Sequence, residues 1–181
     1  RRPFRGGHQT ILMLGASVSI ADNLHLVQTQ IWQAARRSGR DPAEITLVGV
    51  SKTQPAADVA QAVRAGVRHI GENRVQEAAE KFPVVRQLLA GEPVPTFHMV
   101  GHLQTNKAGS AVGLFDCIDS LDSRHLAQAL SRRLAGSDQL AVRLEVYVGD
   151  DERRPGIRPD HLEDVVGQVL EVRHLRIEGL M

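Results

Sequence analysis

The chain has 181 residues, of which 42% are hydrophobic and 24% are charged, the balance of an ordinary globular domain. Its 22 basic residues nearly cancel its 21 acidic residues. This argues against a nucleic-acid-binding protein, which usually has a strong basic excess. No segment of the sequence is long and apolar enough to suggest a membrane span, so we expect no membrane association.

The single cysteine and the N-terminal segment indicate in which cellular compartment the protein functions. Cys117 is the only cysteine, so no internal disulfide can form; this fits a reducing cytosol, and we expect Cys117 to be a small buried core residue. Basic residues precede a short apolar stretch at 11–20, which superficially resembles a signal peptide. We instead interpret residues 1–22 as an N-terminal extension to which the sequence assigns no structure, and we predict a cytoplasmic protein.

Beyond this extension, helical periodicity alternates with short apolar runs typical of buried parallel strands. Pro83 is expected to kink or divide its helix, and Trp32 is expected to lie in the core. The predicted helices are 23–38, 55–65, 73–90, 123–134 and 159–170, and the predicted strands are 45–50, 67–70, 96–100, 115–120, 143–148 and 175–180.

Six strands separated by helices indicate βα units of an α/β fold joined by right-handed crossovers. Periodicity alone leaves two architectures open, an open doubly wound sheet and a TIM-type barrel. The segment after the first strand reads Ser51-Lys52-Thr53-Gln54-Pro55. It is not a glycine-rich dinucleotide loop, which removes the strongest sign of a Rossmann domain.

Lys52 directly follows the first apolar strand and precedes a helix that starts with proline. In parallel α/β folds, functional groups collect at the carboxyl ends of strands. If desolvated there, a lysine has a lowered pKa and presents the neutral amine that attacks an aldehyde. From position alone, a solvated lysine at a strand end is the favoured interpretation, and the functional one depends on further signals.

Other predicted strand ends are also followed by polar residues. Segments 69–74 and 97–107 contain an acid, amides, histidines and cations, and the pairs Asp119-Ser120 and Asp122-Ser123 follow the fourth strand. The second pair can equally serve as a helix N-cap. Polar groups that repeatedly follow apolar strands indicate a shared cleft.

Four short motifs relate the chain to a known family. They are Val50-Ser51-Lys52-Thr53, Gly71-Glu72-Asn73-Arg74-Val75-Gln76-Glu77, the run from His98 to Lys107, and Glu178-Gly179-Leu180-Met181. In their order and spacing they resemble the pyridoxal phosphate homeostasis proteins, whose fold matches the alanine racemase N-terminal barrel. The resemblance covers residues 23–181.

The resemblance implies a TIM-type (β/α) barrel over residues 23–181 that binds pyridoxal 5′-phosphate. Lys52 matches the lysine that forms the Schiff base, Asn73 matches a residue near the pyridine ring, and His98 and Met181 match the wall and floor of the pocket. The implied function is vitamin B6 homeostasis: a carrier without catalysis, monomeric or a weak dimer, that passes the cofactor to apo-enzymes. Further residues of the same motifs have no assigned role: Glu72, Gln76, Gln104, Asn106 and Lys107.

Two other functions stay open. An amino-acid racemase needs a second proton-transfer group opposite the cofactor, typically a tyrosine from another domain, whereas Tyr147 is the only tyrosine here. A remnant with weak cofactor binding is the third possibility. We predict no metal site: His98 and His102 are four residues apart, but on a strand-to-loop segment this spacing does not place both rings on one face.

The sequence also departs from the family pattern. Tyr147 stands where an asparagine is usual, and Arg154-Pro155-Gly156 replaces a Lys-x-Gly. The sequence supplies about six of the eight βα units of a barrel and not the phosphate-binding loops that follow the last two. A fragment, a strand exchange with another chain, and a truncated variant are the three explanations. We expect unpaired edges on the first and sixth strands.

Overall fold

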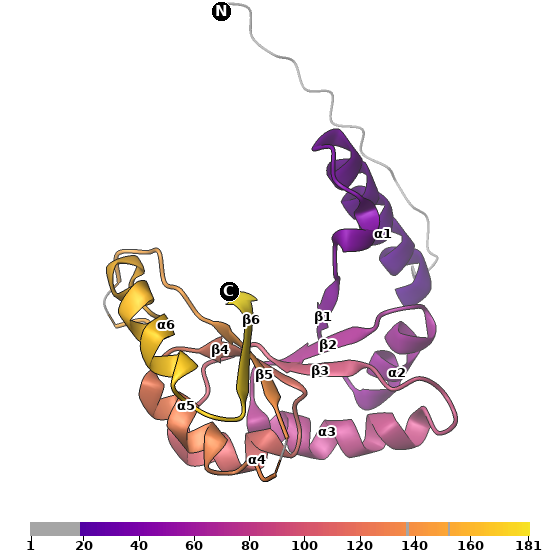
Figure 1. Ribbon diagram of the computed structural model, residues 1–181. Helices are drawn as coiled ribbons and strands as arrows, with labels where there is room; N and C mark the ends of the chain where they lie inside the picture. Colours follow the sequence, from indigo (N-terminus) through magenta and orange to yellow (C-terminus); the bar gives the residue numbers. More distant parts are fainter. Residues whose placement is uncertain (1–18, 137, 152) are drawn as a thin grey trace, which may run out of the picture.

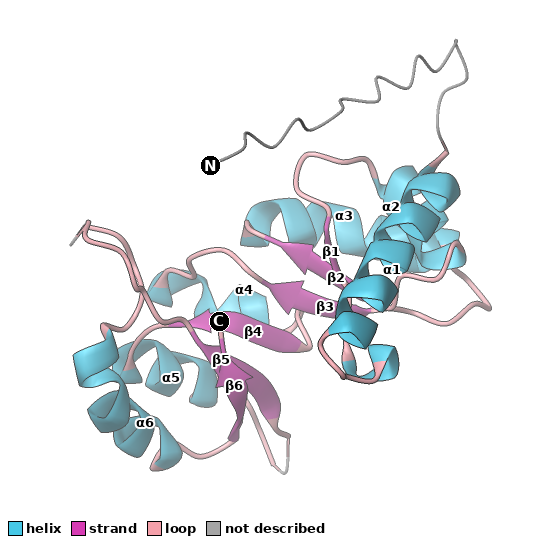
Figure 2. Cartoon of the chain, turned by 90° about the horizontal axis from the view of Figure 1, so that it is seen from above, coloured by secondary structure: helices cyan, strands magenta, loops and turns pink. Residues whose placement is uncertain are grey.

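The computed structural model describes residues 19–136, 138–151 and 153–181. Six parallel strands form one curved sheet in the order β1-β2-β3-β4-β5-β6, with the helices on its outer side (Figures 1 and 2). The helices are α1 (Ile20–Arg37), α2 (Ala56–Arg64), α3 (Val75–Leu88), α4 (Ala108–Val112), α5 (Arg124–Ser131) and α6 (Leu162–Leu170). The strands are β1 (Val48–Val50), β2 (His69–Glu72), β3 (Thr96–Met99), β4 (Cys117–Leu121), β5 (Leu140–Leu144) and β6 (Leu175–Leu180). Three 3₁₀ helices are η1 (Pro42–Glu44), η2 (Thr105–Lys107) and η3 (Pro159–His161).

The strand order distinguishes between the two architectures left open by the sequence. A doubly wound sheet reverses its strand order at a switch point, whereas here each strand pairs with the next one along the chain, as in a barrel wall. Among the described residues, β1 pairs only with β2 and β6 only with β5. The prediction of six units of an incomplete barrel with two unpaired edges is therefore confirmed.

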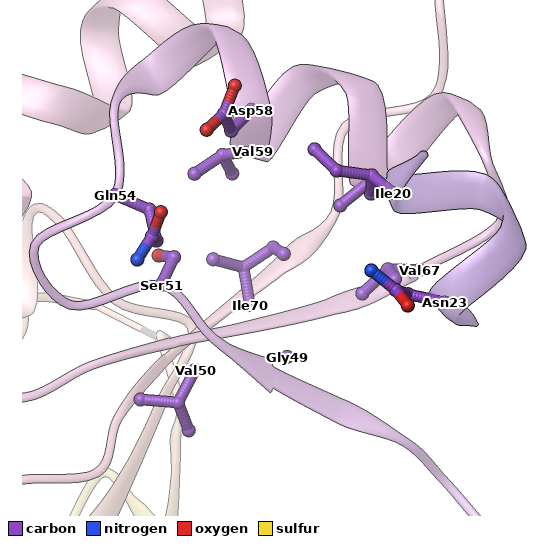
Figure 3. A pocket seen from close by; sticks show the side chains of 11 residues that line it. Ile20, Asn23, Gly49, Val50, Ser51, Gln54, Asp58, Val59, Val67 and Ile70 are labelled. Carbon is purple, nitrogen blue, oxygen red and sulfur yellow. The ribbon is translucent and has the colours of Figure 1, made fainter. Parts of the chain in front are cut away.

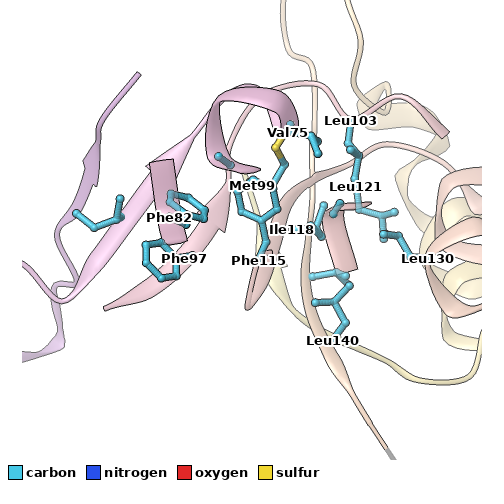
Figure 4. Close-up of a cluster of buried hydrophobic side chains, with 14 of the residues drawn as sticks. Val75, Phe82, Phe97, Met99, Leu103, Phe115, Ile118, Leu121, Leu130 and Leu140 are labelled. Carbon is cyan, nitrogen blue, oxygen red and sulfur yellow. The ribbon is translucent and has the colours of Figure 1, made fainter. Parts of the chain in front are cut away.

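The hydrophobic core lies between the outer face of the sheet and the helices. Paired outward residues of successive strands, such as Ile70 with Phe97 and Ile118 with Val142, are at most 2% exposed. Phe82 of α3 stacks on Phe97 with ring centroids 4.0 Å apart. Figure 4 shows this cluster between β3, β4 and the helices that cover them. Burial of the outer face against the helices stabilises the sheet. The inner face is not part of this core and can carry polar groups.

Several element boundaries differ from those predicted. β1 begins at Val48 rather than at residue 45, because η1 occupies residues 42–44 and Ile45 caps it. α1 begins at Ile20, three residues inside the predicted extension, because Ser19 and Asp22 form a capping box. The remainder of the extension, residues 1–18, lies outside the described residues.

Three further predictions differ from the structure in detail. Pro83 does not divide its helix: α3 continues through it, and Phe82 and Val85 on either side are fully buried. Trp32 is 55% exposed rather than in the core. The fifth strand covers residues 140–144, and within the predicted segment 143–148 Val146 forms only an isolated bridge with Ile157. No helix in the described ranges has the length and apolar character needed to cross a membrane.

Candidate functional site

Two of the four predicted site residues follow neighbouring strands. β1 and β2 are parallel and Val50 pairs with Gly71, so Lys52 and Asn73 each lie two residues beyond the same rung of the sheet. Lys52 is in a turn and is exposed. The expectation that its position would desolvate it is therefore wrong, because β1 is an edge strand of the described sheet and only β2 flanks it.

Asn73 provides an unused hydrogen-bond acceptor at this end of the sheet. Its side chain is partly buried, and its Oδ1 atom is buried without a hydrogen-bond partner among the described residues. Buried polar atoms of this kind are normally paired, so an unpaired one calls for a partner. Asn73 lines a cavity of about 610 Å³ together with His102, Gln104 and Lys107.

Gly101 allows the backbone of Asn73 to approach closely. A Cβ atom at position 101 would overlap the Asn73 carbonyl oxygen and would lie 2.7 Å from the Asn73 Cα atom and 2.8 Å from its Cβ atom. The Gly101 carbonyl also accepts a hydrogen bond of 2.6 Å from the Ser120 hydroxyl. The loop after β3 therefore sets the position of Asn73 through backbone contact rather than through a side chain.

A second cavity lies beneath the turn that contains Lys52. It has a volume of about 510 Å³, is mainly apolar, and lies between α1, β1 and α2. Figure 3 shows Ser51 and Gln54 at one end of this cavity and Ile20 and Asn23 at the other, with Val50 on the opposite side of β1 from Ile70. Ser51 and Gln54, on either side of Lys52 and Thr53, thus line the apolar cavity.

His98 lies deeper, in a polar layer on the inner face of the sheet. Its Nδ1 atom is 2.9 Å from Asp119 Oδ2 and its Nε2 atom is 3.0 Å from His69 Nδ1. Asp119 accepts from His98 Nδ1, and one of the two ring nitrogens carries the proton of the hydrogen bond between His98 and His69. Both ring nitrogens therefore have protein partners, and His98 is only 2% exposed.

Arg143 completes this inner polar layer. Its guanidinium group donates to Asp119 Oδ1 and, at 2.9 Å, to Glu178 Oε2. Burial by itself raises the pKa of Asp119, but hydrogen bonds from His98 and Cys117 outweigh burial and hold that pKa below its ordinary value. The pKa of His69 is lowered, first by burial and then by the charges of His98 and Arg143.

One group of possible metal ligands occurs within this layer. Ligand atoms of His98, Cys117 and Asp119 lie within 4.8 Å of one another. Arg143 donates to the Cys117 sulfur at 3.2 Å and to Asp119, so a fixed cation already occupies the position that a metal ion would need. Burial, followed by the hydrogen bond with Asp119, raises the pKa of the Cys117 thiol. As predicted, Cys117 is buried, and we assign no metal to the group.

Met181 lies at the opposite edge of the curved sheet from Lys52, directly after β6. Its backbone N–H donates to Leu144 at 2.9 Å and its carbonyl accepts from Val146 at 2.8 Å, while its side chain is 44% exposed. Of the four predicted residues, the structure places Lys52 and Asn73 after adjacent strands, His98 deeper on the next strand, and Met181 beyond the last strand. Sequence reasoning missed Arg143 and quoted Glu178 only as part of a motif, without a role, although alternation along β5 and β6 places polar residues on one face.

Comparisons with known proteins agree with this architecture. Residues 23–181 match the family model described as alanine racemase, N-terminal domain. A relative from Escherichia coli (strain K12), the pyridoxal phosphate homeostasis protein, is 38% identical over 163 residues, which cover 90% of this chain and 69% of the relative.

Two solved structures have a similar fold. PipY of Synechococcus elongatus PCC7942, solved with PLP bound, is 36% identical and superimposes with a TM-score of 0.68 over 90% of this chain and 69% of PipY. Alanine racemase of Clostridium difficile 630 is 18% identical with a TM-score of 0.62 over 88% of this chain and 39% of the racemase, a likeness that shows the fold alone. Strand order, family model and relatives together show that this chain belongs to the pyridoxal phosphate homeostasis protein family and contains the alanine racemase N-terminal type of (β/α) barrel wall.

Proposed function

We propose that this chain binds pyridoxal 5′-phosphate through a Schiff base on Lys52 and acts as a carrier in vitamin B6 homeostasis. The observation that supports this best is an exposed lysine amine on a turn after β1, next to the strand end at which Asn73 has an unpartnered oxygen. Membership of the homeostasis family and the PLP bound to PipY support the choice of ligand class.

The residues at the ends of β1 and β2 fit such a ligand. The cofactor supplies a reactive aldehyde when bound. Lys52 offers a primary amine that is free to reach it, and Asn73 offers a polar oxygen that lacks a donor. We propose His98 and Met181 as the wall and floor of the pocket; His98 acts from its fixed place in the inner polar layer and Met181 through its exposed side chain.

A carrier role is favoured over racemization by the position of Tyr147. Two-base racemization needs a second proton-transfer group that faces the cofactor. Tyr147 is the only tyrosine of the chain, and its hydroxyl accepts from the Asp151 N–H at 3.3 Å while its ring lies under the Arg158 guanidinium, 4.5 Å from the ring centroid. These contacts occupy both the hydroxyl and one ring face.

The proposed setting is the cytoplasm, with apo-enzymes that use the cofactor as recipients and with the chain as a monomer or weak dimer. The absence of any disulfide-forming pair of cysteines in the sequence supports a reducing compartment. An exposed lysine suits reversible capture, because water can reach the bond and release the ligand.

The proposal is tested by titrating the full chain with pyridoxal 5′-phosphate and recording the visible absorbance band of the bound cofactor. We expect the native chain and Lys107→Arg to develop the band, and Lys52→Arg, which keeps the charge but not a reactive amine, to lack it. Chiral chromatography of L-alanine incubated with the loaded protein should show no D-alanine. A band that persists in Lys52→Arg would refute the assignment, and turnover of alanine would favour the racemase.

A further inference from the structure

A second lysine lies directly behind the turn that contains Lys52. Lys81 extends from α3 and is only 8% exposed. Its ammonium group donates to Ser51 O at 2.7 Å, to Glu72 Oε1 at 2.6 Å and to Glu77 Oε1 at 2.8 Å. An ammonium group has three donors, so all of them are used.

The acceptors of Lys81 hold the two neighbours of Lys52. Ser51 precedes Lys52; its carbonyl accepts from Lys81, and its hydroxyl donates to Glu72 Oε1 at 2.8 Å. Thr53 follows Lys52, and its N–H donates to Glu77 Oε1 at 2.6 Å. The backbone is therefore fastened immediately before and immediately after the reactive residue.

The conformation of the turn requires this support. Thr53 has a φ of +65°, in the left-handed region that a β-branched residue rarely adopts. Such a conformation persists only where surrounding contacts hold it. Thr53 makes two such contacts: its hydroxyl donates to the Lys52 carbonyl at 2.6 Å, within the turn, and its N–H donates to Glu77, which ties the turn to α3.

The ammonium group of Lys81 is held in its charged form. Burial acts to lower the pKa of Lys81, but hydrogen bonds with Glu72 and Glu77 outweigh it, and the pKa lies above its ordinary value. The pKa of Glu77 is lowered, first by the hydrogen bond from Lys81 and then by that from Thr53. Lys81 is thus a fixed cation with no free electron pair for an aldehyde, whereas the Lys52 side chain is exposed.

We propose that Lys81, with Glu72 and Glu77, positions Lys52 for reaction with an aldehyde ligand by clamping Ser51 and Thr53. The inference rests on the proposed function of Lys52. Lys81 and the two glutamates are positioning residues: they act on the backbone of the turn and do not touch the ligand. A buried ion pair that serves stability alone is the competing explanation, and the two differ in whether capture changes in a protein that remains folded.

Glu77→Ala is the informative variant, because Glu77 is partly exposed and its removal leaves Lys81 paired with the buried Glu72. Glu80→Ala, three residues further along α3 at an exposed position, is the matched control. We expect Glu77→Ala to weaken capture of pyridoxal 5′-phosphate about 10-fold, on the order of one lost hydrogen bond to a charged group. Hydrogen exchange at the Thr53 amide should accelerate by a similar factor, while Glu80→Ala behaves like the native chain in both.

A second variant removes the clamp without leaving a buried charge. Lys81→Met alone would leave the fully buried Glu72 carboxylate without its cationic partner. The double variant Glu72→Gln/Lys81→Met avoids this buried charge and is expected to fold. It should lose capture at least as strongly as Glu77→Ala. The loss should be equal with pyridoxal, which lacks the phosphate, because the variant disturbs the position of the Lys52 amine and not a contact with the phosphate.

The outcomes separate the two proposals. If the native chain captures neither pyridoxal nor its phosphate, the proposed function fails. If the native chain captures the ligand and both clamp variants capture it equally well, with lower melting temperatures only, Lys81 is structural and the positioning role is overturned.

Discussion

Lys81 donates a 2.7 Å hydrogen bond to the carbonyl oxygen of Ser51, the residue immediately before Lys52. The same ammonium group binds Glu77, which in turn accepts from the residue immediately after Lys52. One buried cation on α3 is therefore linked to both sides of the exposed lysine, and the geometry of the strand end depends on the helix behind it.

The aromatic cluster between α3 and β3 predicts where the fold is most sensitive. Phe82 is fully buried between Phe97 and Phe115. Phe82→Ala should lower the free energy of unfolding by about 3–5 kcal/mol through lost burial and a cavity. Val84→Ala, two residues on at a position 43% exposed, should change it little. Urea unfolding of both variants tests this, and equal midpoints would contradict the packing described.

Gly101 predicts a steric effect on Asn73. A methyl group at position 101 would overlap the Asn73 backbone, so Gly101→Ala must displace the loop. We expect a loss of stability of about 1–3 kcal/mol, typical of overpacking, together with weaker cofactor capture. Gly113→Ala is the control, since nothing lies within 4 Å of its Cβ and its φ is −85°. Similar melting temperatures for the two variants would show that the close contact is not restrictive.

The contacts of Arg143 in the inner polar layer are expected to contribute to the stability of the fold. Arg143→Met would leave the buried Asp119 without its guanidinium partner and should cost no more than about 3 kcal/mol, the lower end for a broken buried pair, because Arg143 is partly exposed. Adding Asp119→Asn should recover part of that loss. Thermal unfolding of the single and double variants measures the coupling; additive effects would argue against the pair.

His69 predicts a dependence of stability on pH. Its pKa is lowered in the folded chain, chiefly by burial and by the neighbouring charges of His98 and Arg143. The unfolded chain therefore binds a proton that the folded chain does not, so the free energy of unfolding should fall as the pH falls below about 6.5, the ordinary histidine value. His69→Gln should flatten this dependence, whereas His161→Gln, at an exposed position, should not. Urea midpoints between about pH 7.5 and 5.5, on either side of that value, provide the comparison.

Cys117 predicts an inert thiol. Burial and the hydrogen bond to Asp119 raise its pKa, so the folded chain should contain almost no thiolate at neutral pH. A disulfide reagent that reports thiolate should react with Cys117 only at the rate of unfolding. Rapid reaction in native buffer would contradict the buried position.

The sequence was sufficient to predict six strands, the longer helices between them and the position of Lys52 after β1, because each of these depends on local periodicity. The five-residue helix α4 was not predicted. The sequence was also not sufficient for the exposure of Lys52, which depends on how many strands flank β1. The role of Lys81 was also missed, since a lysine in an amphipathic helix looks like a solvated residue until the fold places it against Glu72. The predicted fifth strand lies too late in the chain. Leu140 and Ala141, which begin β5, are both apolar and show no alternation, whereas Tyr147 extends the strand-like pattern beyond the end of β5.

The most direct test of the role of Lys52 is reduction with borohydride in the presence of pyridoxal 5′-phosphate, followed by peptide mass mapping. The chain has three lysines, Lys52, Lys81 and Lys107, so the position of the label is unambiguous. We predict a stable pyridoxyl group on Lys52 and none on Lys81, whose donors are all engaged. A label mainly on Lys81 or Lys107, or no label at all, would contradict that role.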